Sequence, residues 1–174
     1  MKNLDEDTIF NQALKKQEEK DIKSAFELYK KVLEINPAHL EALSNIGNIL
    51  HSVKNYKDAI NCFKKVYEKD ETNQNALNKL GLIYFNLGSN IKALEYLYIL
   101  KEINQNYTFL RYNLTTILKS KKIIDLKEKN YDLVKKLLIF LFENNDVHHD
   151  SLTKNAIHFI TDQNILKIKI ENNR

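Results

Sequence analysis

The chain has 174 residues, a formal net charge of +4, and 43% hydrophobic residues with three glycines and one proline. This composition suits one helical domain and fits poorly with a turn-rich β-protein. The one cysteine, Cys62, excludes an internal disulfide framework and is expected to be a packed thiol. No apolar run approaches the roughly 18–20 residues that span a bilayer, and the N-terminus is acidic where a secretory leader is basic. A cytoplasmic protein is expected.

Apolar residues recur at helical spacing in paired segments, which predicts six helices, at about 7–19, 23–35, 39–53, 56–69, 74–87 and 90–103. The breaks between them are so short that neighbouring helices must be antiparallel. Asp21, Asn55 and Ser89 are expected to cap the second helix of each pair. Pro37 cannot continue the helix before it, and it disfavours helical geometry at Asn36.

A further helix is predicted at about 108–119, and a second at 131–143 that is apolar almost all round. A helix of that kind is buried on more than one side. Residues 131–142 are therefore expected to close the end of the helical array, with self-association through them as the alternative. A last helix is predicted from Asp150 or Ser151 to about Phe159.

Small residues recur with a fixed period. Ala25, Ala59 and Ala93 are evenly spaced along the chain. A second series with the same spacing consists of Ala13, Gly47 and Gly81. The spacing is a period of about 34 residues, which is typical of a stacked two-helix repeat. Small residues belong where two helices cross closely, since a larger side chain would push their axes apart.

This pattern resembles the tetratricopeptide repeat (TPR) family. One repeat is carried by Leu43, Ile46, Gly47, Leu50, Ala59, Phe63 and Val66, and the next by Leu77, Leu80, Gly81, Tyr84, Ala93, Leu97 and Leu100. The first repeat is atypical, with Gln12 and Lys16 at positions where apolar residues are expected, and the later repeats lack the closing proline.

The resemblance implies an all-α fold, a right-handed α-solenoid of antiparallel helix pairs. Residues 1–120 would form the TPR-like array, with repeats at 6–39, 40–73 and 74–107 and a half repeat at 108–119. Residues 121–174 would form divergent C-terminal helices. The implied function is a non-catalytic protein–protein interaction module, a scaffold or adaptor whose concave groove holds a peptide or helical segment of a partner.

Steps of one period along the first helices lead to Asn11, Asn45, Lys79 and Asn113. In repeats that resemble these, that position lines the concave groove. An asparagine offers both a donor and an acceptor, so a series of them can hold the backbone of an extended peptide. Asn45 and Lys79 are expected to lie side by side as the central contacts. Further polar and aromatic candidates are Ser44, Asn48, His51, Asn75, Asn78, Phe85, Asn86, Phe109 and Tyr112.

Chaperone-binding TPR domains hold a C-terminal carboxylate with a clamp of lysines, asparagines and an arginine. At the corresponding positions here, Asn45 matches and Lys79 replaces the arginine. The remaining clamp positions are occupied by Phe10, Leu14 and Asn75. This mismatch disfavours a receptor for chaperone tails.

No catalytic motif or phosphate-binding loop is found, so neither enzymatic activity nor a cofactor is expected. His148 and His149, with Asp146 and Asp150, are interpreted as a solvated turn and not a metal site. Three alternatives to an adaptor remain open. The chain could be the targeting or substrate-recruiting region of a transferase-type enzyme, a self-associating assembly scaffold, or a nucleic-acid binder. The chain has only two arginines, and this scarcity disfavours nucleic-acid binding.

Overall fold

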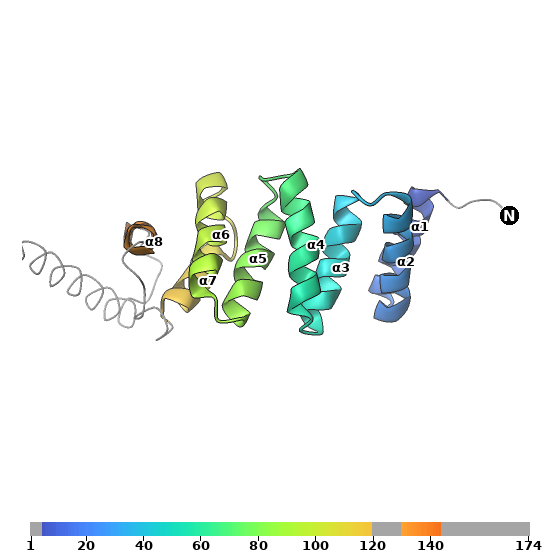
Figure 1. Cartoon of the computed structure of the whole chain (residues 1–174), viewed down its shortest axis with the longest axis horizontal. Coiled ribbons are helices and arrows are strands. Elements are labelled where there is room, and N and C mark those ends of the chain that lie inside the picture. Colours follow the sequence, from blue (N-terminus) through green and yellow to red (C-terminus); the bar gives the residue numbers. More distant parts are fainter. Residues whose placement is uncertain (1–4, 120–129, 144–174) are drawn as a thin grey trace, which may run out of the picture. The chain divides into compact units, whose positions relative to one another are not determined.

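The computed structural model describes residues 5–119 and 130–143, and eight α-helices follow one another in these ranges (Figure 1). They are α1 (Glu6–Glu18), α2 (Ile22–Ile35), α3 (Leu40–Ser52), α4 (Tyr56–Lys69), α5 (Gln74–Asn86), α6 (Asn90–Ile103), α7 (Leu110–Leu118) and α8 (Tyr131–Glu143). The predicted paired helices are confirmed, each end within about one residue. The predicted boundary at residue 120, the pair His148-His149 and the helix predicted near residues 151–159 lie outside the described residues.

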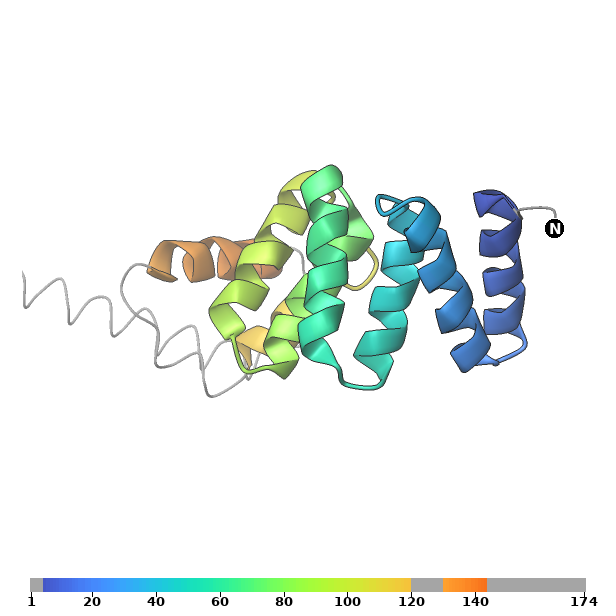
Figure 2. The same cartoon turned by 45° about the vertical axis from the view of Figure 1, so that its right-hand side comes forward.

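Contacts divide the chain into two compact units, unit 1 (Met1–Ile83) and unit 2 (Tyr84–Arg174). In unit 1, α1 packs against α2, α3 packs against α4, and α2 contacts α3 (Figures 1 and 2). The paired antiparallel packing follows from connections too short to let a helix turn anywhere but back along its neighbour. The right-handed coiling of the whole array stays a prediction.

The core of unit 1 is closed by small residues at helix crossings. Ala13, Ala25 and Ala59 are completely buried. A Cβ atom placed on Gly47 would lie 2.9 Å from both Cε2 and Cζ of the Phe63 ring. This contact confirms that a small residue is needed where α3 crosses α4. Cys62 packs at the same crossing, and burial raises the pKa of its thiol, so it is the packed thiol that was expected.

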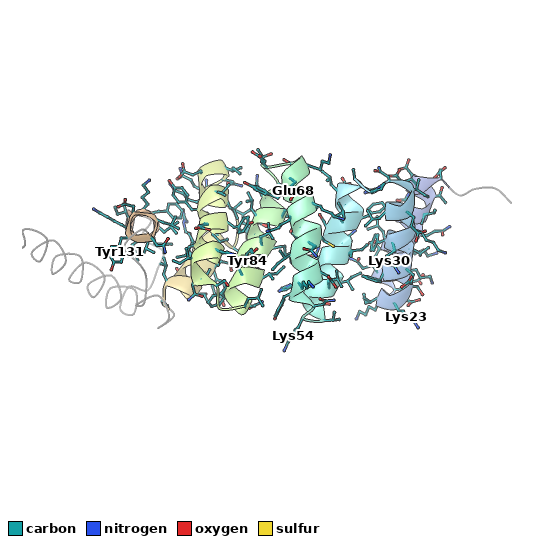
Figure 3. The ribbon with its side chains drawn as sticks, viewed as in Figure 1. Lys23, Lys30, Lys54, Glu68, Tyr84 and Tyr131 are labelled. Carbon is teal, nitrogen blue, oxygen red and sulfur yellow. The ribbon has the colours of Figure 1, made fainter. Side chains whose placement is uncertain are left out.

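The turn inside each helix pair has the same backbone geometry from one period to the next. Lys20, Lys54 and Gly88 have φ angles of 62°, 61° and 73°. Figure 3 labels Lys54 at the turn after α3. The N–H of Asn55 donates to the Leu50 carbonyl at 2.9 Å, and the N–H of Lys54 donates to the His51 carbonyl at 3.0 Å. This pair of bonds is a Schellman motif, which satisfies the last carbonyls of the first helix. The left-handed conformation costs a lysine more than a glycine.

The residue after each of these turns begins the second helix. The N–H of Ser24 donates to Oδ1 of Asp21 at 3.2 Å, and the N–H of Asp58 donates to Oδ1 of Asn55 at 3.5 Å. Ser89 occupies the same N-cap position but makes no capping bond with its side chain. The prediction of side-chain caps is therefore confirmed for the first two helix pairs and wrong for the third, where the backbone alone makes the turn.

The turn between successive helix pairs also repeats. Oδ1 of Asn36, Asp70 and Asn104 accepts a hydrogen bond at 3.0 Å from the N–H two residues later. Side chains that bond to the backbone in this way mimic a backbone turn. They explain why the second and third repeats turn without the proline that follows Asn36 in the first.

The start of α7 departs from the predicted 108–119. The equivalent N-cap positions before α1, α3 and α5 are Asp5, His39 and Asn73, and each side chain accepts a backbone N–H three residues later. Tyr107 occupies the fourth such position. Its ring has no acceptor near the helix start, so the helix begins only at Leu110.

In unit 2, α8 packs against α6 and α7. Its buried side chains are Val134, Leu137, Leu138, Phe140 and Leu141. The Phe140 ring lies 5.5 Å from Nζ of Lys101 on α6 and 5.8 Å from Cζ of Arg111 on α7, so two cations face one aromatic ring. The buried side chains of α8 are thus packed inside the unit, while closure of the array and self-association through residues 131–142 both stay predictions.

Candidate functional site

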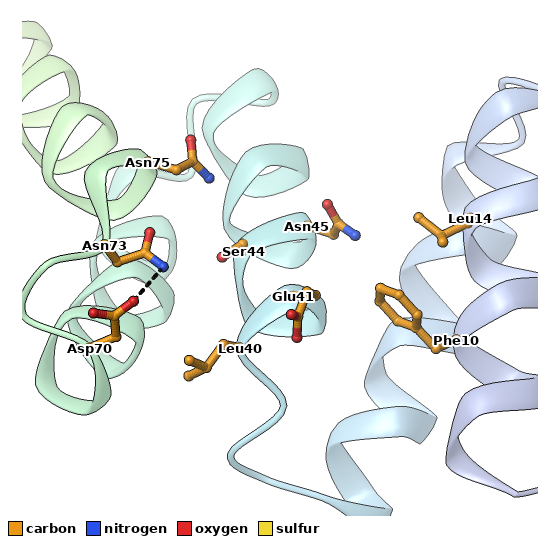
Figure 4. Close-up of a pocket in the computed structure, with 9 residues that line it drawn as sticks. All are labelled: Phe10, Leu14, Leu40, Glu41, Ser44, Asn45, Asp70, Asn73 and Asn75. Atoms are coloured by element: carbon orange, nitrogen blue, oxygen red, sulfur yellow. Dashed lines mark hydrogen bonds between the residues drawn. The ribbon is translucent and has the colours of Figure 1, made fainter. Parts of the chain in front are cut away.

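A pocket of about 500 Å³ opens on one surface of unit 1 (Figure 4). We call it the inner groove. Figure 4 shows Phe10 and Leu14 of α1 on one side and Asn73 and Asn75 on the other, with side chains of α3 between them. Its lining residues are Phe10, Leu14, Leu40, Glu41, Ser44, Asn45, Asp70, Asn73 and Asn75.

The helical repeat explains why these side chains share a surface. On α3, the buried residues Leu43 and Ile46 point into the core. Ser44 and Asn45 lie between them in sequence and point to another side, because each residue is rotated by about 100° from the one before it. On α1, Phe10 and Leu14 are one turn apart and each follows a buried residue. The faces of α1 and α3 that do not point into the core therefore line the inner groove.

Asn45 is oriented by a buried phenol. Burial raises the pKa of Tyr29, and a hydrogen bond with the Asn45 side chain opposes that shift. The Tyr29 hydroxyl donates to Oε1 of Gln17 on α1 at 3.0 Å. Asn45 therefore lies next to the buried Tyr29 and also lines the inner groove.

The acidic corner of the inner groove contains Asp70, at the end of α4, and Glu41, in the first turn of α3. Oδ1 of Asp70 accepts from the Thr72 hydroxyl at 2.7 Å and Oδ2 accepts from the Asn73 amide at 3.2 Å. The bond from Thr72 is the main reason that the pKa of Asp70 is lowered, with the bond from Asn73 adding to it. The carboxylate is accordingly held in its charged form.

Three of the residues singled out in the sequence line the inner groove, namely Asn45, Ser44 and Asn75. Lys79 follows Asn75 by one turn of α5 and is not among the lining residues. Its charge acts on His51, whose pKa is lowered first by burial and then by Lys79. Asn45 thus lines the groove, and its expected pairing with Lys79 stays a prediction.

The other predicted contacts differ in exposure. Asn11 is exposed, and Tyr112 is 71% exposed. Asn78 and Asn113 are only 6% and 5% exposed, so little of either side chain is left for a partner. Tyr112 and Asn113 belong to unit 2, and the asparagine series through Asn113 stays a prediction.

Asn48 has a feature of its own. Its Oδ1 is buried and accepts no hydrogen bond from any residue that the structure describes. Buried side-chain oxygens normally have a partner. Asn48 therefore has an unused acceptor on the same helix as Asn45.

Four lining residues were missed by the sequence analysis: Leu40, Glu41, Asp70 and Asn73. A signal for two of them was present. Glu41 lies one period before Asn75, so the two occupy the same position in successive repeats. Asp70 also lies one period after Asn36, whose place before Pro37 had already marked a turn.

The described residues 5–119 and 130–143 contain no group of three or more histidine, cysteine or acidic side chains that could hold a metal ion. Within the same residues no helix is both long and apolar enough to cross a bilayer.

Two family profiles match the chain, "TPR repeat" over residues 47–88 and "Tetratricopeptide repeat" over residues 8–39. Neither profile describes an enzyme. The fold is an all-helical, TPR-like array of antiparallel helix pairs, and the chain is a TPR repeat protein, as the resemblance predicted. No curated protein matches the chain significantly in sequence.

Solved structures share the fold. YrrB, described as a TPR protein with an unusual peptide-binding site, is 22% identical with a TM-score of 0.69, over 92% of this chain and 79% of YrrB. The first TPR of Spaghetti (RPAP3), bound to an HSP90 peptide, is 15% identical with a TM-score of 0.61, over 64% and 89%. The Sgt2 TPR domain from Aspergillus fumigatus is 22% identical with a TM-score of 0.58, over 64% and 76%.

Proposed function

We propose that this chain is a non-catalytic adaptor of the cytoplasm that binds a peptide segment of a partner protein in the inner groove. The observation that carries the proposal is the lining itself, in which neutral amide and hydroxyl groups stand beside apolar side chains in a space of about 500 Å³. That combination is typical of sites that hold a peptide backbone by hydrogen bonds and take one or two of its side chains as anchors.

Asn45 and Asn75 are the central contacts in this proposal. Each amide offers donors and an acceptor, which matches the alternating N–H and C=O groups of an extended backbone. Ser44 lies between them in the lining and adds a hydroxyl.

Phe10 and Leu14 supply the apolar wall, and both are half-buried before any partner arrives. A partner side chain packed against them would remove apolar surface from water at about 25 cal/mol per Å². Asn11, Asn48, His51 and Lys79 of unit 1 are proposed as outer contacts, and the expected roles of Asn78, Tyr112 and Asn113 stay predictions.

Peptide binding is known for proteins of this fold, since the RPAP3 domain was solved with the HSP90 peptide SRMEEVD. An acidic tail of that kind is disfavoured here. Phe10 and Leu14 offer no donor to a carboxylate, and Glu41 and Asp70 would repel it. The proposal is therefore a peptide groove of different chemistry.

A double variant tests the proposal. Asn45→Ala with Asn75→Ala removes both central amides, and Asn61→Ala, at an exposed position of α4 outside the groove, is the matched control. Peptides would be selected from a random displayed library on the intact chain, and their affinities measured by fluorescence polarisation on all three proteins.

We expect the double variant to bind the selected peptides at least about tenfold more weakly, because two net hydrogen bonds of about 1 kcal/mol each are lost. The Asn61→Ala variant should bind like the wild type. Equal affinity for the double variant and the wild type, with unchanged circular dichroism, would remove the inner groove as the binding site.

A further inference from the structure

The charge of the inner groove is opposite to that of the chain. Among its nine lining residues are two carboxylates, Glu41 and Asp70, and there is no lysine, arginine or histidine. The chain as a whole carries a net charge of +4. The groove therefore carries a local negative charge on a chain whose net charge is positive.

Glu41 has one basic side chain beside it, and that side chain also contacts other groups. Oε2 of Glu41 lies 3.2 Å from Nδ1 of His39. That same nitrogen accepts the backbone N–H of Ala42 at 3.3 Å, where it serves as the N-cap of α3. The other ring nitrogen, Nε2, lies 3.6 Å from Oε1 of Glu6, so His39 is shared between the start of α3 and two glutamates. The glutamate side chain is 72% exposed and faces the opening.

Asp70 has hydrogen bonds but no counter-charge. Its two oxygens accept from Thr72 and Asn73, which are neutral. None of the ion pairs formed in the described part of the chain includes Asp70. These bonds fix the carboxylate in place without cancelling its charge, so both acids of the groove keep their attraction for a cation.

The apolar residues beside the acids complete the site. Leu40 adjoins Glu41, and Figure 4 shows the Phe10 ring on the side of Glu41 that faces α1. A lysine or arginine side chain combines an aliphatic stem with a charged end, so the stem can pack on apolar surface while the end meets a carboxylate. The face of an aromatic ring also attracts a cation.

From these contacts we infer that the inner groove selects a peptide segment bearing lysine or arginine, with its cationic side chain between Glu41 and Phe10 or at Asp70. The inference rests on the proposed function and adds the chemistry of the partner. The neutral amides of Asn45 and Asn75 bind the backbone of the peptide, and Glu41 and Asp70 select its basic side chain.

The test uses a random displayed peptide library selected on the intact chain and on two variants with the same change in net charge. Glu41→Lys reverses the charge in the groove. Glu68→Lys is the matched control, since Glu68 is an exposed residue of α4 outside the lining and is labelled in Figure 3. A third variant, Asp70→Asn, removes a charge but keeps a side-chain oxygen that can accept from Thr72.

We expect the wild type to recover peptides enriched in lysine and arginine over the starting library. Glu41→Lys should lose that enrichment, whereas Glu68→Lys should retain it. For one recovered peptide, replacing its basic residue by glutamine should weaken binding to the wild type by about two- to tenfold. The same replacement should have little effect on binding to Glu41→Lys, and the difference should shrink at high salt.

Peptides without an excess of basic residues, or with an excess of acidic ones, would overturn the inference and leave the proposed function intact. An equal loss of enrichment in Glu68→Lys would also overturn it, because the preference would then come from net charge and not from the groove. If no peptide is recovered above the level of the Asn45→Ala, Asn75→Ala variant, the proposed function and the inference both fail.

Discussion

The two units of this chain differ in what packs beside their helix pairs. In unit 1, the surface between α1, α3 and the turn before α5 remains open and is lined by polar, acidic and apolar side chains. In unit 2, α8 packs on α6 and α7 and has buried side chains such as Val134 and Leu137, whereas Tyr112 of α7 is 71% exposed. The additional helix, with its own buried apolar face, distinguishes unit 2 from unit 1.

The turns give a second contrast between the units. In unit 1, the helices start at side-chain caps such as Asp21 and His39, and the left-handed turn positions are lysines. In unit 2, α6 and α7 start without a side-chain cap, and the turn position is Gly88. The left-handed turn is thus kept in both units, while the residue that adopts it and the capping of the following helix change.

The largest expected effect comes from truncation of one buried aromatic residue in each unit. Phe140→Ala and Phe63→Ala should each lower the free energy of unfolding by about 3–5 kcal/mol, because both rings are buried. Chemical denaturation measures this. Phe140→Ala should in addition release α8 from α6 and α7 and make the protein self-associate, which light scattering detects. A monomeric Phe140→Ala protein with unchanged stability would contradict the role of α8 as a cover.

The next largest effect concerns the crossing of α3 and α4. Gly47→Ala would place a Cβ 2.9 Å from the completely buried Phe63 ring, which has no room to move. Overpacking costs about 1–3 kcal/mol, and the higher helix propensity of alanine offsets up to about 1 kcal/mol. We expect a net loss of about 1–2 kcal/mol in thermal or urea unfolding. A stabilised variant would show that the crossing is looser than the structure indicates.

The turn positions offer a smaller, reciprocal test. Lys54→Gly should raise the free energy of unfolding by up to about 1 kcal/mol, since glycine adopts φ near 61° without the steric cost that lysine has. Gly88→Lys should lower it by about the same amount. If both changes are destabilising, the loss of chain entropy for glycine outweighs the relief of the left-handed conformation.

The smallest effect is electrostatic. Burial and then the charge of Lys79 lower the pKa of His51 from its ordinary 6.5, so the unfolded chain takes up this proton before the folded chain does. The contribution to stability is complete above pH 6.5 and is lost as the pH falls below it. Histidine NMR titration should give a pKa below 6.5, and Lys79→Gln should raise it. An unchanged pKa of His51 in the Lys79→Gln variant would mean that the two side chains are too far apart to interact.

Local features of the chain were predictable because their causes are local. Asp21 and Asn55 act as caps because their short polar side chains reach the N–H three residues later. The late start of α7 follows the same rule, since Tyr107 stands where Asp5, His39 and Asn73 cap the earlier helices. The repeat period alone would have revealed this difference, had the cap positions been compared along with the core positions.

The site was less predictable because it depends on which helix faces remain after packing. Asn78 and Lys79 are adjacent in sequence, yet one is 6% exposed and the other half-buried, because successive residues of a helix differ by about 100° in direction. Neither lines the inner groove.

By itself, the sequence determined the helix pairs, their period and most of their turns, since propensities, caps and small residues at crossings act within a few residues of the chain. Tertiary packing decided the composition of the inner groove. Packing brings Phe10 of α1, Glu41 of α3 and Asn75 of α5 to one surface across distant parts of the chain. The negative charge of that surface arises only when these faces meet, because no single segment of the sequence carries it.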